Sequence, residues 1–223
     1  TFGVLRGDVD GLGIRLRRLQ SIEEHVQLSV MYKQFFAGEL EVVCSLPEFW
    51  RKVTLLYTGR DDFAVIGAWD ALLLLAREFQ RVFHRFNEES LKQLPGPEGR
   101  TISMALALAT EPAADARKVF REAGRRLDEA KSTDKDGFHV FGQLIEWRHL
   151  NHAVQLKDTL LKLAAHHHCP SYMLADLQRL YKEEGLSSRG QPERFPRPWR
   201  YYRHLSLAAG TGRDREFQRL RSQ

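Results

Sequence analysis

Two adjacent aspartates, Asp61 and Asp62, are the residues of this sequence whose spacing most suggests chemistry. They complete a turn segment that begins at Gly59 and separates two apolar, β-prone runs, residues 54–57 and 63–67. This pattern predicts a β-hairpin with both carboxylates at its tip. Two like charges about 4 Å apart repel by roughly 4 kcal/mol at an effective dielectric near 20, unless a cation or a donor offsets them. The pair therefore indicates a cation site, with a solvated turn as the alternative.

A second pair of aspartates, Asp8 and Asp10, follows the same logic near the N-terminus. Residues 3–13 read as a strand with a tight glycine exit, and the period of two places both carboxylates on one face of it. An Asp-x-Asp pair at the end of a strand suits Mg²⁺, which prefers one or two carboxylates together with substrate phosphates. A solvated strand end is the alternative.

Hydrophobic periodicity predicts the elements that must position these aspartates. Ser21 and Glu24 form a capping box in front of one helix, and Asp70 is expected to cap another. A proline-glycine breaker covers residues 95–99. The predicted elements are a strand within residues 3–13, a helix over 21–36, strands over 54–57 and 63–67, a helix over 71–89, a strand over 101–110, a helix over 115–131 and a strand over 138–141.

The first six of these elements have the order β-α-β-β-α-β, which predicts an α+β fold, a ferredoxin-like palm with an antiparallel sheet and its helices on one face. We place this domain at residues 1–149 and a small helical domain at 150–223, where no strand pattern continues. In such a sheet the first strand neighbours the central hairpin, so all four aspartates are expected to meet. Carboxylates at one edge indicate a Mg²⁺-nucleotide site, in which metal ions bridge phosphate oxygens.

Composition describes an ordinary globular chain of 223 residues, 43% hydrophobic and 28% charged. The formal charge of +5 permits an anionic partner such as nucleic acid. Cys44 and Cys169 show no framework spacing, and no run of 18 uncharged apolar residues exists, so we expect a cytoplasmic protein without a membrane span. The first residue is Thr1, which suggests a segment of a larger polypeptide.

Three stretches carry a family resemblance, and the hairpin is the most specific. They are residues 5–13 (LRGDVDGLG), 35–40 (FFAGEL) and 57–70 (YTGRDDFAVIGAWD), with shorter matches at 101–103, 129–132 and 141–142. The chain resembles the second palm domain and following helical domain of the large polymerase/cyclase-like subunit of type III CRISPR effector complexes. The likeness covers essentially the whole chain, more thinly after residue 150.

The resemblance implies assembly with sister CRISPR effector subunits, CRISPR RNA and target RNA. It also implies conversion of ATP to cyclic oligoadenylate, with Mg²⁺ or Mn²⁺ as the metal. By the motif match, the residues implied are Asp61 and Asp62 for catalysis, Asp8, Asp10 and Asp61 for the metal, and Gly59, Arg60, Ser103 and Lys131 for the nucleotide.

Several departures from the family pattern predict a changed activity. The family hairpin reads Gly-Gly-Asp-Asp, and here Arg60 replaces the second glycine. If that position needs positive φ, the replacement costs about 1 kcal/mol or more. Arg60 could also pair with Asp8 or Asp61, or reach a triphosphate. Ala105 stands where a glycine is usual, and neither a first palm nor an HD nuclease motif is present.

We therefore expect the palm to act mainly as an architectural part of the complex, with cyclase activity lost or weakened. The alternative is an active ATP-dependent cyclic oligoadenylate synthase or a standalone palm-type nucleotide cyclase.

Two features of the C-terminal part have simpler interpretations. Residues 166–169 (HHHC) could suggest zinc, but contiguous ligands point in different directions and no second pair follows at suitable spacing, which favours a polar helix end. The basic, aromatic residues 194–204 suit a protein interface, with nucleic-acid stacking as the alternative. Helices are predicted over 154–165, 172–181 and 199–209.

Overall fold

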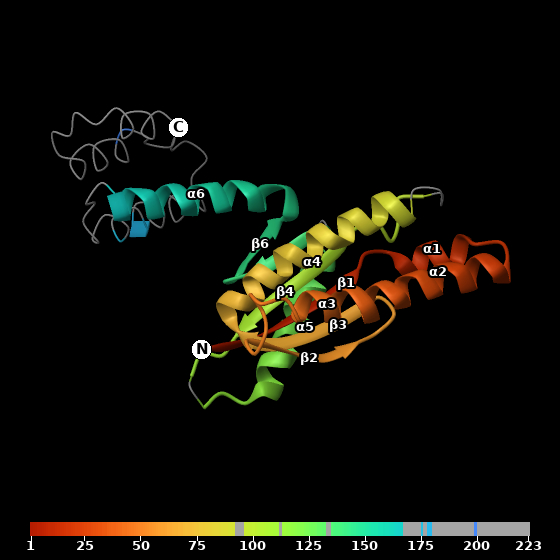
Figure 1. Cartoon of the computed structure of the whole chain (residues 1–223), viewed down its shortest axis with the longest axis horizontal. Coiled ribbons are helices and arrows are strands. Elements are labelled where there is room, and N and C mark those ends of the chain that lie inside the picture. The colour runs from red at the N-terminus through yellow and green to blue at the C-terminus, as the bar shows by residue number, and fades with distance from the viewer. Residues whose placement is uncertain are drawn as a thin grey trace. The chain divides into compact units, whose positions relative to one another are not determined.

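A six-stranded sheet frames the first part of the chain (Figure 1). The computed structural model describes residues 1–91, 96–111, 113–132 and 135–166, with isolated positions 175, 178, 179 and 199. The chain divides into two units, Thr1–Leu150 and Asn151–Gln223. The elements are β1 (Phe2–Val9), α1 (Leu12–Arg18), α2 (Ile22–Gln34), the π-helix η1 (Phe35–Glu39), α3 (Leu40–Cys44), β2 (Val53–Thr58), β3 (Asp62–Ala68), α4 (Trp69–Ser90), β4 (Ile102–Leu108), α5 (Ala116–Ser132), β5 (Gly137–Val140), β6 (Gln143–Glu146) and α6 (Trp147–His166).

The sheet has the order β2-β3-β1-β4-β5-β6, and its first four strands form the ferredoxin-like core. This confirms the predicted α+β palm and its central pairing of β1 with the hairpin strand β3. The prediction of an antiparallel sheet is wrong in one place, because β5 runs parallel to β4. Helix α5 carries the chain back across the sheet between these two strands, as a parallel pair requires.

Helices cover both faces of the sheet, and not one face as predicted. Leu5 of β1 lies in the larger apolar cluster with α4, whereas its neighbour Val4 packs with Val119 and Ala123 of α5. Successive side chains of a strand point to opposite faces, so α4 and α5 must lie on opposite sides. Strand β4 is buried on both faces for the same reason.

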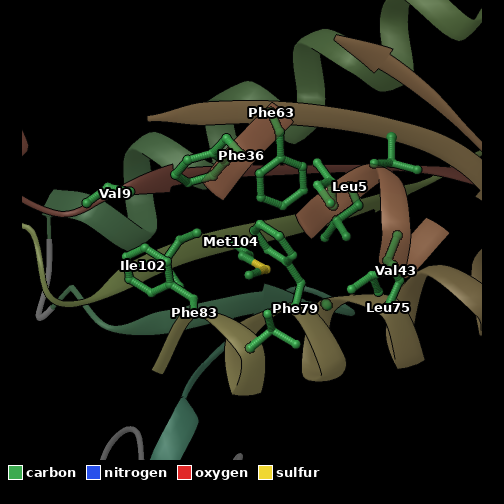
Figure 2. Close-up of a cluster of buried hydrophobic side chains, with 14 of the residues drawn as sticks. Leu5, Val9, Phe36, Val43, Phe63, Leu75, Phe79, Phe83, Ile102 and Met104 are labelled. Atoms are coloured by element: carbon green, nitrogen blue, oxygen red, sulfur yellow. The ribbon is translucent and has the colours of Figure 1, made fainter. Parts of the chain in front are cut away.

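Aromatic side chains fill the larger cluster, which lies between the sheet and α4 (Figure 2). Phe79 of α4 lies 4.9 Å from Phe63 of β3, centroid to centroid, and 5.7 Å from Phe36 of η1. The helical spacing of Leu72, Leu75 and Phe79 places them all on the buried face, as predicted.

The ends of the helices agree with the sequence-based expectations in one case and differ in two. Ser21 caps α2 as predicted, accepting a hydrogen bond from the Glu24 amide at 3.1 Å. Asp70 caps nothing, because α4 begins at Trp69 and its N-cap is Ala68. The helix predicted over 21–36 does not end there, because α2 continues through η1 into α3.

Helix α6 begins within the first unit at Trp147 and continues into the second. Trp147 stacks on Phe138 at 5.1 Å and donates its Nε1 proton to the Ile102 carbonyl at 2.8 Å. Within the described ranges, no helix combines the length and apolar character needed to cross a membrane. The predicted helices over 172–181 and 199–209, residues 167–169 and the basic aromatic tail lie outside the described residues, apart from the isolated positions.

Candidate functional site

The tip of the β2–β3 hairpin meets the end of β1 and brings three of the four aspartates together. The Gly59 amide donates to the Asp62 carbonyl at 2.7 Å, which closes the turn and leaves Asp61 at its tip. The Val9 amide donates to the Asp61 carbonyl at 2.9 Å, and Asp8 lies opposite Asp62 in the β1–β3 register. The predicted carboxylate edge is therefore formed by backbone pairing.

Asp8 is half-buried and forms an ion pair with Lys131, at the end of α5. Burial raises the pKa of Asp8, and the negative charges of Asp61 and Asp62 raise it further, while Lys131 opposes them. The predicted nucleotide residue Lys131 thus lies at the carboxylate edge and there supplies a positive charge.

Asp62 is held by its own hairpin. Tyr57 donates its hydroxyl proton to Asp62 Oδ2 at 3.0 Å. The other oxygen, Oδ1, lies over Gly59, where an added Cβ would overlap it. A side chain at Gly59 would therefore push the Asp62 carboxylate out of this position. Sequence reasoning did not single out Tyr57, because its contact depends on a β-bulge between Leu55 and Tyr57 that no local pattern marks.

Asp10 does not join the other three carboxylates. It is only 3% exposed, and its Oδ1 accepts from Ser103 Oγ at 2.8 Å. Its Oδ2 accepts from Thr101 Oγ1 at 2.9 Å and from the Asp136 amide at 3.0 Å. Ser103 is fully buried, so this predicted nucleotide residue serves Asp10 in the interior. Burial and the charge of Asp10 raise the pKa of Asp136.

Arg60 takes an ordinary backbone conformation at the exposed tip of the turn. Among the described residues, the non-glycine positions with positive φ are Arg51, Lys135, Asp136 and Phe141. The expected strain at Arg60 is therefore wrong, since the turn closes with φ in a region open to any residue. Arg60 pairs with neither Asp8 nor Asp61 in the described part of the chain, and Asp8 pairs with Lys131.

A pocket of about 360 Å³ lies beside the hairpin. Its lining includes two basic residues, Lys33 and Arg60, and two residues with hydroxyl groups, Ser29 and Thr58. The rest of its lining comes from Val30, Ala37 and Gly59. A mostly apolar pocket that two basic residues line suits a ligand with a large apolar part and an anionic group.

The donor set at the tip fits a hard divalent cation, because Mg²⁺ and Mn²⁺ favour carboxylate oxygens. In the described part of the chain, however, no three His, Cys, Asp or Glu side chains form a group that could hold a metal ion as they stand. Lys131 occupies one oxygen of Asp8, and Tyr57 occupies one oxygen of Asp62. A cation bound there would have to share Asp8 with Lys131.

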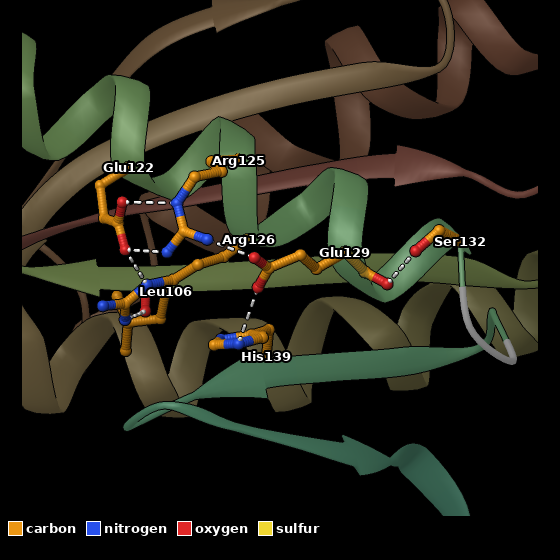
Figure 3. Close-up of polar contacts among 7 residues, drawn as sticks. All are labelled: Leu106, Glu122, Arg125, Arg126, Glu129, Ser132 and His139. Carbon is orange, nitrogen blue, oxygen red and sulfur yellow. Dashed lines mark hydrogen bonds and ion pairs between the residues drawn. The ribbon is translucent and has the colours of Figure 1, made fainter.

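A ladder of charges on α5 orients the helix end that carries Lys131 (Figure 3). Glu122 accepts hydrogen bonds from both Arg125 and Arg126. Glu129 pairs with Arg125 and lies 3.5 Å from Nε2 of His139, a buried residue of β5. The ladder thus ties the last turns of α5 to the sheet.

Comparison with known proteins gives one family for this arrangement. The family model described as Cas10/Cmr2, second palm domain, matches residues 1–139. A Cas10/Csm1 single-strand-specific deoxyribonuclease of subtype III-A from Enterococcus italicus is 24% identical over 197 residues, which cover 83% of this chain and 24% of the relative. Its counterpart from Mycobacterium tuberculosis is 28% identical over 163 residues, 62% of this chain and 18% of the relative. The chain spans about a quarter or less of these relatives.

Solved structures share the fold. A Csm1–Csm4 cassette in complex with pppApApA has a TM-score of 0.72 at 20% identity, covering 94% of this chain and 33% of that chain. The apo cassette has a TM-score of 0.70 at 19% identity, covering 98% of this chain and 33% of that chain.

Proposed function

The chain belongs to the family of Cas10/Cmr2 second palm domains, and from this membership we propose that it is the nucleotide-binding palm of the large subunit of a type III CRISPR effector complex. The observation that carries the proposal is the meeting of Asp8, Asp61 and Asp62 beside a pocket that Lys33 and Arg60 line. Adenine nucleotides are the ligand class, as the solved Csm1–Csm4 cassettes with AMPPNP and ATP support.

The same relatives support the partners of this chain. The Csm1–Csm4 cassettes, and the subcomplex described within the type III-A interference complex, favour a Csm4-like subunit as a direct neighbour. CRISPR RNA and target RNA belong to the same assembly in this proposal. Residues 1–149 form the palm, and residues 150–223 form the helical domain that meets other subunits.

Each residue of the site has a role in nucleotide binding. Lys33 and Arg60, which both line the pocket, bind phosphate oxygens from that side. Asp8 and Asp61 hold Mg²⁺ or Mn²⁺, with Asp62 beside them, and the bound metal supplies neutralisation of the phosphate charge. Lys131 balances the charge of Asp8 when no cation is bound.

Synthesis of cyclic oligoadenylate is weakened in this palm. Lys131 competes with a cation for Asp8, and Asp10 is committed to three donors in the interior. One observation favours the second candidate, an active synthase. Arg60 has no backbone strain and projects at the exposed tip next to the pocket, so the exchange of glycine for arginine leaves the turn intact.

The first test is ATP binding by the complex purified with its CRISPR RNA, in Mn²⁺. We expect binding that falls at least about tenfold in Asp61→Asn and in Lys33→Ala, because each removes a charge from the site. Asp70→Asn, in the exposed first turn of α4, and Lys52→Ala, at the far end of β2, are the matched controls. A complex that binds no ATP contradicts the proposed function.

The second test measures cyclic oligoadenylate after addition of target RNA, ATP and Mg²⁺ or Mn²⁺. A weakened palm yields little product although ATP is bound. Abundant product would contradict the proposed weakening of cyclase activity and would support the second candidate, an active synthase.

A further inference from the structure

Arg6 lies in the interior of β1, on the face that α5 covers, with a small residue on each side. Its cross-strand partners are Ala64 of β3 and Ala105 of β4, both fully buried. Tyr57 of β2 pairs with Ala64 from the other side. Because alanine adds so little bulk, the arginine side chain can extend across β3, and its Nη2 donates to Tyr57 Oη at 3.3 Å.

Helix α5 is shaped around the same guanidinium group. A Cβ added at Gly124 would lie 2.5 Å from Arg6 Nη1, so a glycine in the helix interior makes room for it. Glycine destabilises a helix interior relative to alanine, so this position gives up helix stability for space. Phe120 places its ring 4.6 Å from Arg6 Cζ, a favourable cation–π contact.

A β-bulge turns Tyr57 toward Arg6. Leu55 pairs with Val65 and packs with the cluster on the α4 face. In a regular strand Tyr57, two residues later, would point to that face as well. The register shifts between Leu55 and Tyr57, so Tyr57 pairs with Ala64 and lies against Phe120 of α5 instead. Bulges near functional sites re-aim side chains in this way.

The charge of Arg6 is otherwise poorly compensated. Among the described residues no carboxylate forms an ion pair with it, and its buried Nε has no hydrogen-bond partner. Even a partly buried guanidinium without a direct counter-ion carries a desolvation cost. The nearest anion along its hydrogen bonds is Asp62, which it reaches through Tyr57.

From this geometry we propose that Arg6 and Tyr57 are positioning residues, which hold the carboxylate of Asp62 in place and so pre-organise the cation-binding edge at the hairpin tip. The proposal deepens the proposed function and rests on it for the cation. Partners that orient carboxylates around a metal are worth about 10- to 100-fold in metal affinity or activity.

The direct test measures the affinity of the full chain for Mn²⁺ by electron paramagnetic resonance, in the absence of nucleotide. Tyr57→Phe removes only the hydroxyl group, and we expect an affinity about tenfold weaker. A crystal structure of the same variant should show the Asp62 carboxylate displaced from its place over Gly59. Unchanged or tighter Mn²⁺ binding, or an Asp62 that has not moved, overturns the proposal.

Gly124→Ala tests the chain of contacts from its far end. The added methyl group displaces the tip of a flexible arginine, so the helix should gain stability while Mn²⁺ affinity falls. Arg121→Ala, on the exposed side of α5, is the control and should leave the affinity unchanged. In a Tyr57→Phe background Gly124→Ala should cause no further loss of Mn²⁺ affinity, because the hydrogen bonds from Arg6 through Tyr57 to Asp62 are already broken. Additive losses of affinity contradict the proposal that Arg6 acts through Tyr57.

Failure of the proposed function gives a different result. If the wild-type chain binds neither Mn²⁺ nor ATP, the nucleotide site is wrong. The position of Asp62 in the Tyr57→Phe crystal structure then still decides whether Arg6 and Tyr57 hold it.

Discussion

For Arg60, the structure predicts an effect on stability opposite in sign to the one that the sequence suggested. If its position required positive φ, Arg60→Gly would stabilise the chain by about 1 kcal/mol. Since Arg60 has an ordinary φ, we expect the glycine to lower the free energy of unfolding by about 0.5–1 kcal/mol, through the larger entropy of the unfolded chain. Urea unfolding measures the difference, with Arg60→Ala as the control for side-chain loss. A stabilised glycine variant would restore the strain hypothesis.

Single residues also show where sequence reasoning stops. The adjacency of Asp61 and Asp62, and their meeting with Asp8, were predictable because strand pairing follows from the order of elements. Asp10 was predicted to share the face of Asp8 by the period of two. That period ends with β1 at Val9, and Gly11 then turns the chain with a φ of 74°. Asp10 is consequently fixed by donors from Thr101, Ser103 and Asp136, which no local pattern could indicate.

At the scale of elements, the packing of α5 on β5 should make stability depend on pH. Burial lowers the pKa of His139, Arg126 and Arg125 lower it further, and Glu129 partly opposes them. His139 therefore binds a proton less readily in the folded state than in the unfolded chain, where it is protonated below about pH 6.5. The free energy of unfolding should decrease as the pH falls through that value toward the lower folded-state pKa.

The measurement is chemical unfolding between pH 7.5 and pH 5. His139→Gln should reduce the slope in this range, because glutamine takes up no proton. His84→Gln, on the exposed side of α4, is the control and should keep the wild-type slope. An unchanged slope in His139→Gln would contradict the role of His139.

Elements were predictable in type wherever hydrophobic periodicity was long. The buried face of α4 and the apolar run of β4 are examples. The short β6 and the bulge in β2 were not, because each is defined by pairing with a neighbouring strand. The side of the sheet that α5 covers depends on how the β4–β5 connection crosses it, which the sequence pattern alone leaves open.

At the scale of the whole molecule, the first unit should be stable without the second. The first unit ends with the first turn of α6, which contributes Trp147. This side chain is buried, stacked on Phe138 and hydrogen-bonded to Ile102. We expect a chain ending at Leu150 to unfold cooperatively in urea with the stability of the palm. A chain ending at Glu146 should be about 3–5 kcal/mol less stable, the usual cost of losing a buried large aromatic residue. Equal stability of the two truncated chains would contradict this role of Trp147.

The glycine at position 124 carries an evolutionary consequence. Among the described residues, the side chain that an added Cβ there would meet is that of Arg6, more than a hundred positions earlier in the chain. The two sites should therefore co-vary among homologous palms: lineages that replace Arg6 by a shorter residue are free to accept alanine at position 124 and recover about 0.5–1 kcal/mol of helix stability. Lineages that keep the arginine pay for it with a permanently weakened helix.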